Sequence, residues 1–223
     1  MDIRRTDKFL RRHRGRRTGA VKIERCVDFP NLFGDKMTDT EMPSQTRPPW
    51  LLDHVYIIAE VGPNHDGNLD NALRIIEQVA ASGADAVKFQ TFASARSVVA
   101  LGAPLAAYMK ASEDHDDQEE LLERIRLSYN DFRTIANFCA AQGIAFLSTP
   151  FDEMSVDFLV ELGVPLLKMP SGEITNGFLL KAAAKSSLPL IVSTGMADEA
   201  EIAAALDLIR ATWQDQGHIA DDE

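Results

Sequence analysis

The stretch Gly83-Ala84-Asp85-Ala86-Val87-Lys88-Phe89-Gln90-Thr91-Phe92 decides the fold of this chain. A glycine that ends a helix-like segment is followed by a short apolar run, Ala86–Gln90, of the length typical of a buried strand. Side chains of a strand alternate between its faces, so Lys88 and Gln90 share one face and Phe89 lies on the other. A buried lysine costs free energy unless its charge finds a partner. The run therefore predicts an interior strand that ends at a polar site.

The same order of strand, polar loop and helix occurs five times along the chain. Such alternation requires right-handed crossovers and a parallel sheet. Further strands are expected at Tyr56–Glu60, Ile144–Ser148, Leu166–Met169 and Leu190–Ser193. Apolar residues at helical spacing predict helices at Leu69–Ser82, from a Ser128 or Asn130 cap to Gln142, and at Glu153–Leu162, Gly177–Lys185 and Asp198–Ala211.

The length of the folded part bounds the architecture. A typical eight-stranded α/β barrel takes roughly 250 residues, whereas about 170 follow Trp50 in this chain. We therefore expect the α/β class, with a parallel (β/α)8 TIM-barrel type of fold that is incomplete, about five β/α units being present. A long acidic excursion over Thr91–Leu127 is expected to interrupt the repeat.

Charge divides the chain into regions. Residues 1–36 carry 11 Lys or Arg against 5 Asp or Glu, whereas the remainder carries 12 against 29. The basic segment lacks the apolar core of a secretory signal. Nucleic-acid contact, a transit peptide, a disordered extension and residues added upstream of a start at Met37 stay open for it. The expected organisation is a basic, disordered extension and linker at 1–49, a partial barrel at 50–211 and a polar tail at 212–223.

Composition indicates a protein of the cytoplasm without a membrane span. Hydrophobic residues make up 45% of the chain, enough for a sizeable core, yet no run approaches 18 apolar residues. The two cysteines, Cys26 and Cys139, are far apart and have no metal-type partners nearby in sequence. We expect both to be reduced and Cys139 to be a small buried hydrophobe.

Polar residues recur where the predicted strands end. Parallel strands place their carboxyl ends on one side of a sheet, so these side chains are expected to converge on one site. Two interior lysines on separate strands favour a shared anion, such as a phosphate or carboxylate. The alternative is that each lysine pairs with a neighbouring carboxylate and only stabilises the fold. The residues are Lys88, Gln90, Thr149, Lys168, Ser171, Glu173 and Ser193.

Five segments also resemble the N-acetylneuraminate (sialic acid) synthase family, in the order in which that family has them. The first is Tyr-Ile-Ile-Ala-Glu-Val-Gly-Pro-Asn-His-Asp-Gly at 56–67, and the second is the stretch at 83–92. The others are Phe-Leu-Ser-Thr-Pro-Phe-Asp at 146–152, Leu-Lys-Met-Pro-Ser-Gly-Glu-Ile-Thr-Asn at 167–176 and Ile-Val-Ser-Thr-Gly-Met-Ala at 191–197. Five ordered motifs spanning about residues 55–205 make a specific match.

The resemblance implies a chemistry. Members of this family are TIM barrels that condense phosphoenolpyruvate with an N-acetylated amino sugar such as N-acetylmannosamine. They release a sialic-acid-type nonulosonate and phosphate, use Mn²⁺ or Mg²⁺, and assemble as homodimers. The resemblance thus implies a transferase of carbohydrate biosynthesis with these two substrates as its partners.

The resemblance also assigns roles to residues. Glu60 matches the carboxylate that handles the proton of the attacking water or of the tetrahedral intermediate, and an ion-pair role with Lys88 is an alternative that need not exclude this one. Asn64 and His65 are further substrate-binding candidates, with loop ordering as the alternative for His65. Glu60, Lys88 and Lys168 form the expected catalytic set. Lys88, Thr149, Lys168, Ser171 and Ser193 match positions that hold phosphoenolpyruvate, and Gln90 and Glu173 match positions near the sugar.

The chain departs from the family pattern after Ala211. The family's metal histidines, its sugar-binding aspartate and its C-terminal antifreeze-like domain have no counterpart there. We therefore expect a truncated synthase that does not itself bind the metal. Two alternatives stay open: a related phosphoenolpyruvate-condensing enzyme, such as a 3-deoxy-octulosonate phosphate synthase, and a non-catalytic remnant or one piece of a split enzyme.

Overall fold

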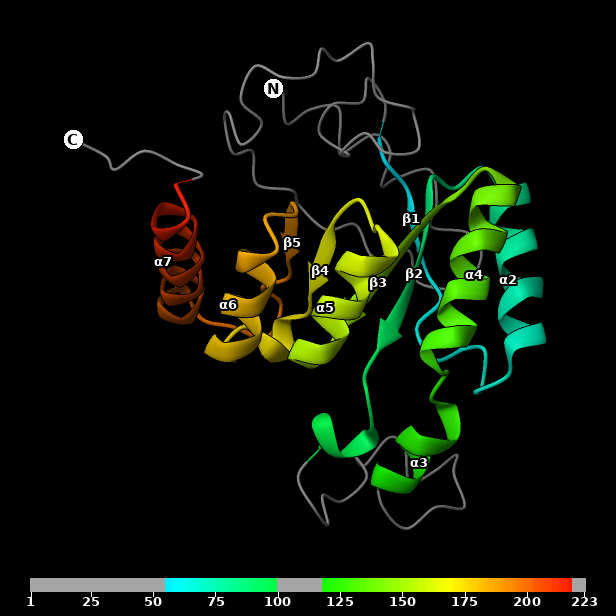
Figure 1. The fold of residues 1–223 in the computed structure, drawn as a ribbon, viewed down its shortest axis with the longest axis horizontal. Coiled ribbons are helices and arrows are strands. Elements are labelled where there is room, and N and C mark those ends of the chain that lie inside the picture. The colour runs from blue at the N-terminus through cyan, green and yellow to red at the C-terminus, as the bar shows by residue number, and fades with distance from the viewer. Residues whose placement is uncertain (1–54, 100–117, 218–223) are drawn as a thin grey trace, which may run out of the picture.

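Short parallel strands alternate with helices in the computed structural model, which describes residues 55–99 and 118–217 (Figure 1). The strands are β1 (Ile58–Glu60), β2 (Ala86–Thr91), β3 (Ala145–Pro150), β4 (Leu167–Met169) and β5 (Leu190–Val192). The helices are α2 (Leu69–Ala81), α3 (Gln118–Ile125), α4 (Tyr129–Gln142), α5 (Glu153–Leu162), α6 (Gly177–Lys185) and α7 (Glu199–Asp215), with 3₁₀ turns η4 (Ala95–Ser97) and η5 (Ser171–Glu173). The five predicted strands and the five predicted helices are confirmed, with small shifts at their ends.

The strands form two parallel sheets. One has the order β1-β2-β3 and the other pairs β4 with β5, while β3 packs beside β4. Glu60 lies opposite Lys88 in register, Gln90 lies opposite Thr149, and Lys168 lies opposite Ile191. The described part of the chain thus has the parallel α/β architecture expected from the sequence, divided between β3 and β4.

The two faces of the strands have different cores. The larger core joins alternate strand residues, among them Val87, Phe89 and Met169, to the apolar faces of the helices. The smaller core consists of Ala86, Ala145, Leu147, Leu166 and Ile191, with Tyr56 and Ile58 packed against it. Alternation places these residues on the side of the strands away from the helices. One face of the strands therefore packs against the helices. The other face carries the smaller core and the polar residues of the candidate site.

Helix ends follow local chemistry. The Ser128 side chain accepts from Asp131 N–H, and the Asp131 carboxylate accepts from Ser128 N–H. Ser128 therefore caps α4, and Asn130 lies within the helix. Side chains of Asn68, Asp152, Asn176 and Asp198 accept hydrogen bonds at the starts of α2, α5, α6 and α7. The caps of α2, α5, α6 and α7 start these helices in the connection that follows a strand, whereas α4 follows α3.

The excursion expected at Thr91–Leu127 contains the 3₁₀ turn η4 and the helix α3, which pack together within its described residues. One expectation needs correction. The polar tail predicted from 212 begins too early, because α7 continues to Asp215 and buries Trp213 (2% exposed). The extension predicted at 1–49 lies outside the described residues. No helix in the described part of the chain is both long and apolar enough to cross a membrane.

Candidate functional site

Six predicted site residues lie within the strands or directly after them, on the face away from the helices. Lys88 shares its face with Ala86, and Lys168 shares its face with Leu166; both apolar residues belong to the smaller core. Two strand spacings, from β2 across β3 to β4, amount to roughly 10 Å, within the combined reach of two lysine side chains. The six residues are Glu60, Lys88, Gln90, Thr149, Lys168 and Ser193.

Lys88 is at the centre of a hydrogen-bonded group. Its ammonium forms an ion pair with the Glu60 carboxylate and donates to Thr149 Oγ1 at 3.3 Å. The Lys88 side chain is 10% exposed, whereas that of Glu60 is 43% exposed. The ammonium is therefore removed from water and supported by partners on both neighbouring strands, while the carboxylate keeps one side open to solvent. The ion pair considered as an alternative role for Glu60 is present.

The second lysine, Lys168, is the middle residue of β4. Lys168 is 4% exposed and its ammonium donates to Met169 O at 3.2 Å. Ser171 and Glu173 follow in the turn η5, where Glu173 Oε2 accepts from Asn176 Nδ2 at 2.9 Å. Ser193 follows β5 directly and its backbone N–H donates to Met169 O at 3.0 Å. Hydroxyl, ammonium and carboxylate groups thus follow β4 and β5 in close succession.

The turn after β1 approaches the site through Gly62, a residue that the sequence analysis did not single out. Gly62 has φ +51°, and a Cβ on it would lie 3.2 Å from Glu60 Oε1 and 3.7 Å from Gln90 Nε2. The backbone N–H groups of Val61 and Gly62 both donate to Lys88 O, at 2.9 and 3.1 Å. A glycine two residues after a carboxylate at a strand end was the only sequence signal for this close approach.

His65 is not brought to the same face. Its ring stacks on Phe89 at 5.8 Å, and Phe89 belongs to the core beneath the helices. His65 is 3% exposed, and its Nδ1 accepts from Gly67 N–H at 3.1 Å, which leaves the proton of the neutral ring on Nε2. Burial lowers the pKa of His65, partly opposed by the Asp66 carboxylate. These contacts support the loop-ordering alternative for His65, and Asn64 beside it is exposed.

The loop after β1 also contacts the helix α3. Asp66 lies 3.6 Å from the Arg124 guanidinium, and a Cβ on Gly67 would lie only 2.2 Å from Arg124 O. The backbones of the loop and the helix therefore approach so closely that only glycine fits at position 67. The loop is fixed by β2 on one side and by α3 on the other.

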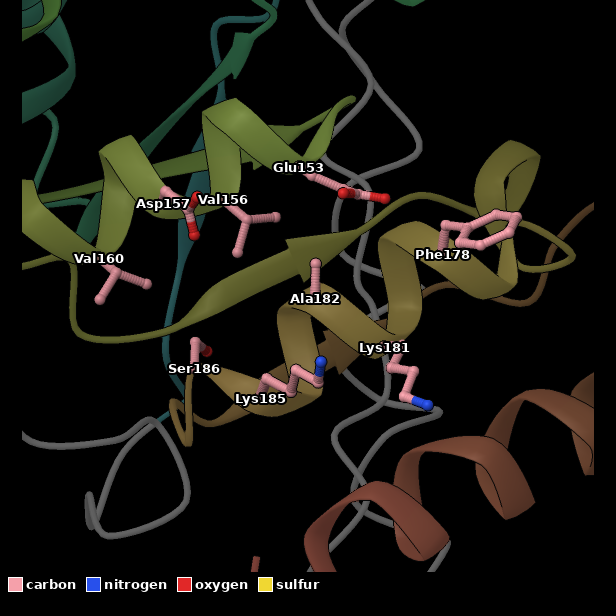
Figure 2. A pocket seen from close by; sticks show the side chains of 9 residues that line it. All are labelled: Glu153, Val156, Asp157, Val160, Phe178, Lys181, Ala182, Lys185 and Ser186. Carbon is pink, nitrogen blue, oxygen red and sulfur yellow. The ribbon is translucent and has the colours of Figure 1, made fainter. Parts of the chain in front are cut away.

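The family resemblance implies a divalent metal, for which the described residues offer no fit. Within 55–99 and 118–217, no three or more His, Cys, Asp and Glu side chains cluster in a way that would hold a metal ion. A groove of about 510 Å³ lies between α5 and α6 (Figure 2). Its walls include Asp157, Phe178 and Lys181 and none of the predicted site residues.

Comparison with known proteins gives a consistent result. A sequence model described as the NeuB family matches residues 75–220. The chain is 45% identical over 156 residues to an N,N'-diacetyllegionaminic acid synthase of Legionella pneumophila, covering 70% of this chain and 44% of that protein. It is 44% identical over 154 residues to the synthase of the same name from Campylobacter jejuni, covering 69% of this chain and 46% of that protein.

A solved structure resembles the fold as well. It is the N-acetylneuraminic acid (sialic acid) synthetase of Leptospira borgpetersenii serovar Hardjo-bovis in complex with citrate, at TM-score 0.57 and 32% identity. The match covers 70% of this chain and 50% of that one. The chain thus spans about half the length, or slightly less, of the relatives that it matches.

Proposed function

The chain belongs to the NeuB family, and from that premise we propose that the polar residues on the strand face away from the helices form part of the active site of a sialic-acid-type nonulosonate synthase. The proposed reaction condenses phosphoenolpyruvate with the aldehyde of an N-acetylated amino sugar. The observation that carries the proposal is the pair of buried lysines, Lys88 and Lys168, on one face of the strands, with the Glu60 carboxylate against Lys88. The TIM-barrel form of the complete fold is part of the same proposal.

Phosphoenolpyruvate is an anion at both its phosphate and its carboxylate. Two buried ammonium groups on one face of the strands, with a hydroxyl and a carboxylate in contact with one of them, suit such a ligand, because charge-assisted hydrogen bonds are strong where water is excluded. We assign Lys88, Thr149 and Lys168 to this anion, together with the hydroxyls of Ser171 and Ser193. The buried position of Thr149 beside the Lys88 ammonium supports the assignment.

Glu60 is assigned to the proton. In the proposed sequence the enol carbon of phosphoenolpyruvate attacks the sugar aldehyde, and cationic charge develops at the carbon that bears the phosphate. Water adds to that carbon, its proton passes to a base, and the C–O bond to phosphate breaks. A half-exposed carboxylate held by a lysine is suited to take this proton. Gln90 and Glu173 are assigned to the sugar.

The acceptor is proposed at the level of its class. Both curated relatives described above are named for N,N'-diacetyllegionaminic acid, so a sugar with two acetamido groups is the counterpart to compare with N-acetylmannosamine. A homodimer and a cytoplasmic location belong to the proposal too. None of the steps assigned above is routed through a metal ion.

The test follows the oxygen atoms. The 223-residue chain is mixed with phosphoenolpyruvate, Mn²⁺ and each sugar in water enriched in oxygen-18, and the phosphate released is analysed by mass spectrometry. Cleavage of the C–O bond leaves the phosphate unlabelled, whereas simple hydrolysis at phosphorus labels it. Glu60→Gln is expected to slow phosphate release by about 10²- to 10⁴-fold. The control Lys185→Ala, in the groove between α5 and α6, should leave phosphate release unchanged.

Binding is measured separately by calorimetry. Phosphoenolpyruvate binding without turnover would favour the remnant or split-enzyme alternative for this chain. Absence of binding in both this chain and a version extended by the family's later strands would reject the proposed function.

A further inference from the structure

The Glu60 carboxylate has two differently occupied oxygens. Oε2 is in the ion pair with the Lys88 ammonium, whereas Oε1 lies toward Gly62, where the Gln90 amide is also near. An added Cβ at Gly62 would lie 3.2 Å from Oε1, tighter than ordinary van der Waals contact. A methyl group at this position therefore requires either the carboxylate or the turn to move by a few tenths of an ångström.

Neither side of this contact is free to move independently. The carboxylate is held by the Lys88 ammonium, which is buried and bonded to Thr149. The turn is held by the Lys88 carbonyl, which accepts from both Val61 N–H and Gly62 N–H. One residue of β2 therefore fixes the turn through its backbone and the carboxylate through its side chain.

We propose that Gly62 is a positioning residue for Glu60. Its bare Cα leaves room for Oε1 beside Gln90 while Oε2 stays on Lys88, so that the carboxylate has one orientation. This role rests on the proposed function, in which Glu60 takes the proton of the attacking water. Gly62 acts only through Glu60, so an added side chain should change the placement of the base and not the binding of the phosphate.

The first test is a double-mutant cycle on stability, which needs neither ligand nor turnover. Gly62→Ala and the control Gly83→Ala both force alanine into left-handed backbone, at φ +51° and +81°, and nothing lies within 4 Å of a Cβ on Gly83. Each should raise the unfolding equilibrium constant roughly 5- to 30-fold through this strain. The Gly62→Ala effect should be larger than that of the control in the wild-type background and should fall to the control's value when Glu60→Ala is also present.

The second test is kinetic. In the synthase assay, Gly62→Ala should lower kcat about tenfold through misplacement of the base. The KM for phosphoenolpyruvate should stay within about twofold, because the lysines are untouched. Gly83→Ala should leave both constants unchanged. Gly62→Asn provides a second variant if alanine prevents folding, since asparagine tolerates the left-handed region but carries the same Cβ.

The two tests separate the two proposals. An excess effect of Gly62→Ala that persists without the Glu60 side chain would overturn the positioning role, whatever the chain catalyses. A rise in KM with unchanged kcat would overturn it as well. A cycle that shows coupling, while neither this chain nor the version extended by the family's later strands binds phosphoenolpyruvate, would keep the link between Gly62 and Glu60 and reject the proposed reaction.

Discussion

The carboxylate of Glu60 lies against the ammonium of Lys88, its register partner on the neighbouring strand. The pair joins the last residue of β1 to the middle of β2, three residues before β2 ends at Thr91. Its two members differ in exposure, so it combines a desolvated cation with an accessible base. Because of this difference, replacement of Lys88 and replacement of Glu60 should have different effects on ligand binding, catalysis and stability.

Replacement of Lys88 by methionine should weaken phosphoenolpyruvate binding about 10- to 100-fold, since one charge-assisted hydrogen bond is lost. The free energy of unfolding should fall by less than the about 3–5 kcal/mol of a fully buried ion pair, because water solvates the half-exposed Glu60. Calorimetry and urea denaturation measure the two quantities. Lys185→Met, on an exposed lysine outside the site, is the control. An unchanged affinity would place the ligand elsewhere.

Much of this arrangement was predictable from side-chain alternation. Within Ala86–Gln90, the positions of Lys88 and Phe89 required opposite faces, and the two separate cores confirm that division. The ends of the strands could also be predicted, because each polar loop follows a short apolar run. The helix α3 could not be predicted, since its sequence is mostly polar and Leu121 is its buried residue.

Other features could not be predicted from the sequence, because they depend on contacts between distant segments. The 61 positions that separate Lys88 from Thr149 give no local pattern that would predict their hydrogen bond. From the sequence, His65 could either bind substrate or order its loop, and its stacking on Phe89, a distant residue, supports the structural role. Gly62 and Gly67 look like ordinary turn glycines until their neighbours in space are known.

Replacement of Gly67 by alanine should detach α3 from the loop after β1. The new Cβ would lie 2.2 Å from a backbone oxygen of Arg124, which cannot rotate away as a side chain can. The expected loss of unfolding free energy is at least about 2–3 kcal/mol, above the about 1–2 kcal/mol of left-handed strain alone. Gly163→Ala, with φ +81° and nothing within 4 Å of its added Cβ, measures that strain. Equal losses in the two variants would show that α3 does not rest on Gly67.

Acidification should destabilise the fold through His65. Its pKa is lowered in the folded chain by burial, so the unfolded chain takes up the proton first, near pH 6.5. The free energy of unfolding should therefore decrease as the pH falls below about 6.5, by at most about 1.4 kcal/mol per pH unit. His65→Gln should flatten this slope below about pH 6.5 in urea titrations. The pKa of Glu123 is also lowered, by its bonds to Ala95 N–H and Arg126, but its effect belongs to more acidic solutions. A slope unaltered by His65→Gln would assign the effect to another group.

Trp213 should anchor the last described helix to the fold. It is 2% exposed, and its indole N–H donates to Ala184 O on α6 at 3.0 Å. Trp213→Ala is expected to lower the free energy of unfolding by about 3–5 kcal/mol, and Trp213→Phe by less, since most of the apolar burial is kept. Arg210→Ala, one turn earlier and exposed, should change it by no more than about 0.5 kcal/mol.

Removal of residues 212–223 gives an independent measure of the same anchor. If Trp213 supplies most of the contact between α7 and α6, this deletion should cost at least as much as Trp213→Ala in urea denaturation. A deletion that costs less than about 1 kcal/mol, within the range of ordinary surface changes, would mean that α7 is held by Ala205 and Ile209. The residues of α7 after Ala211 would then contribute little to the stability of the fold, even though the helical backbone continues to Asp215.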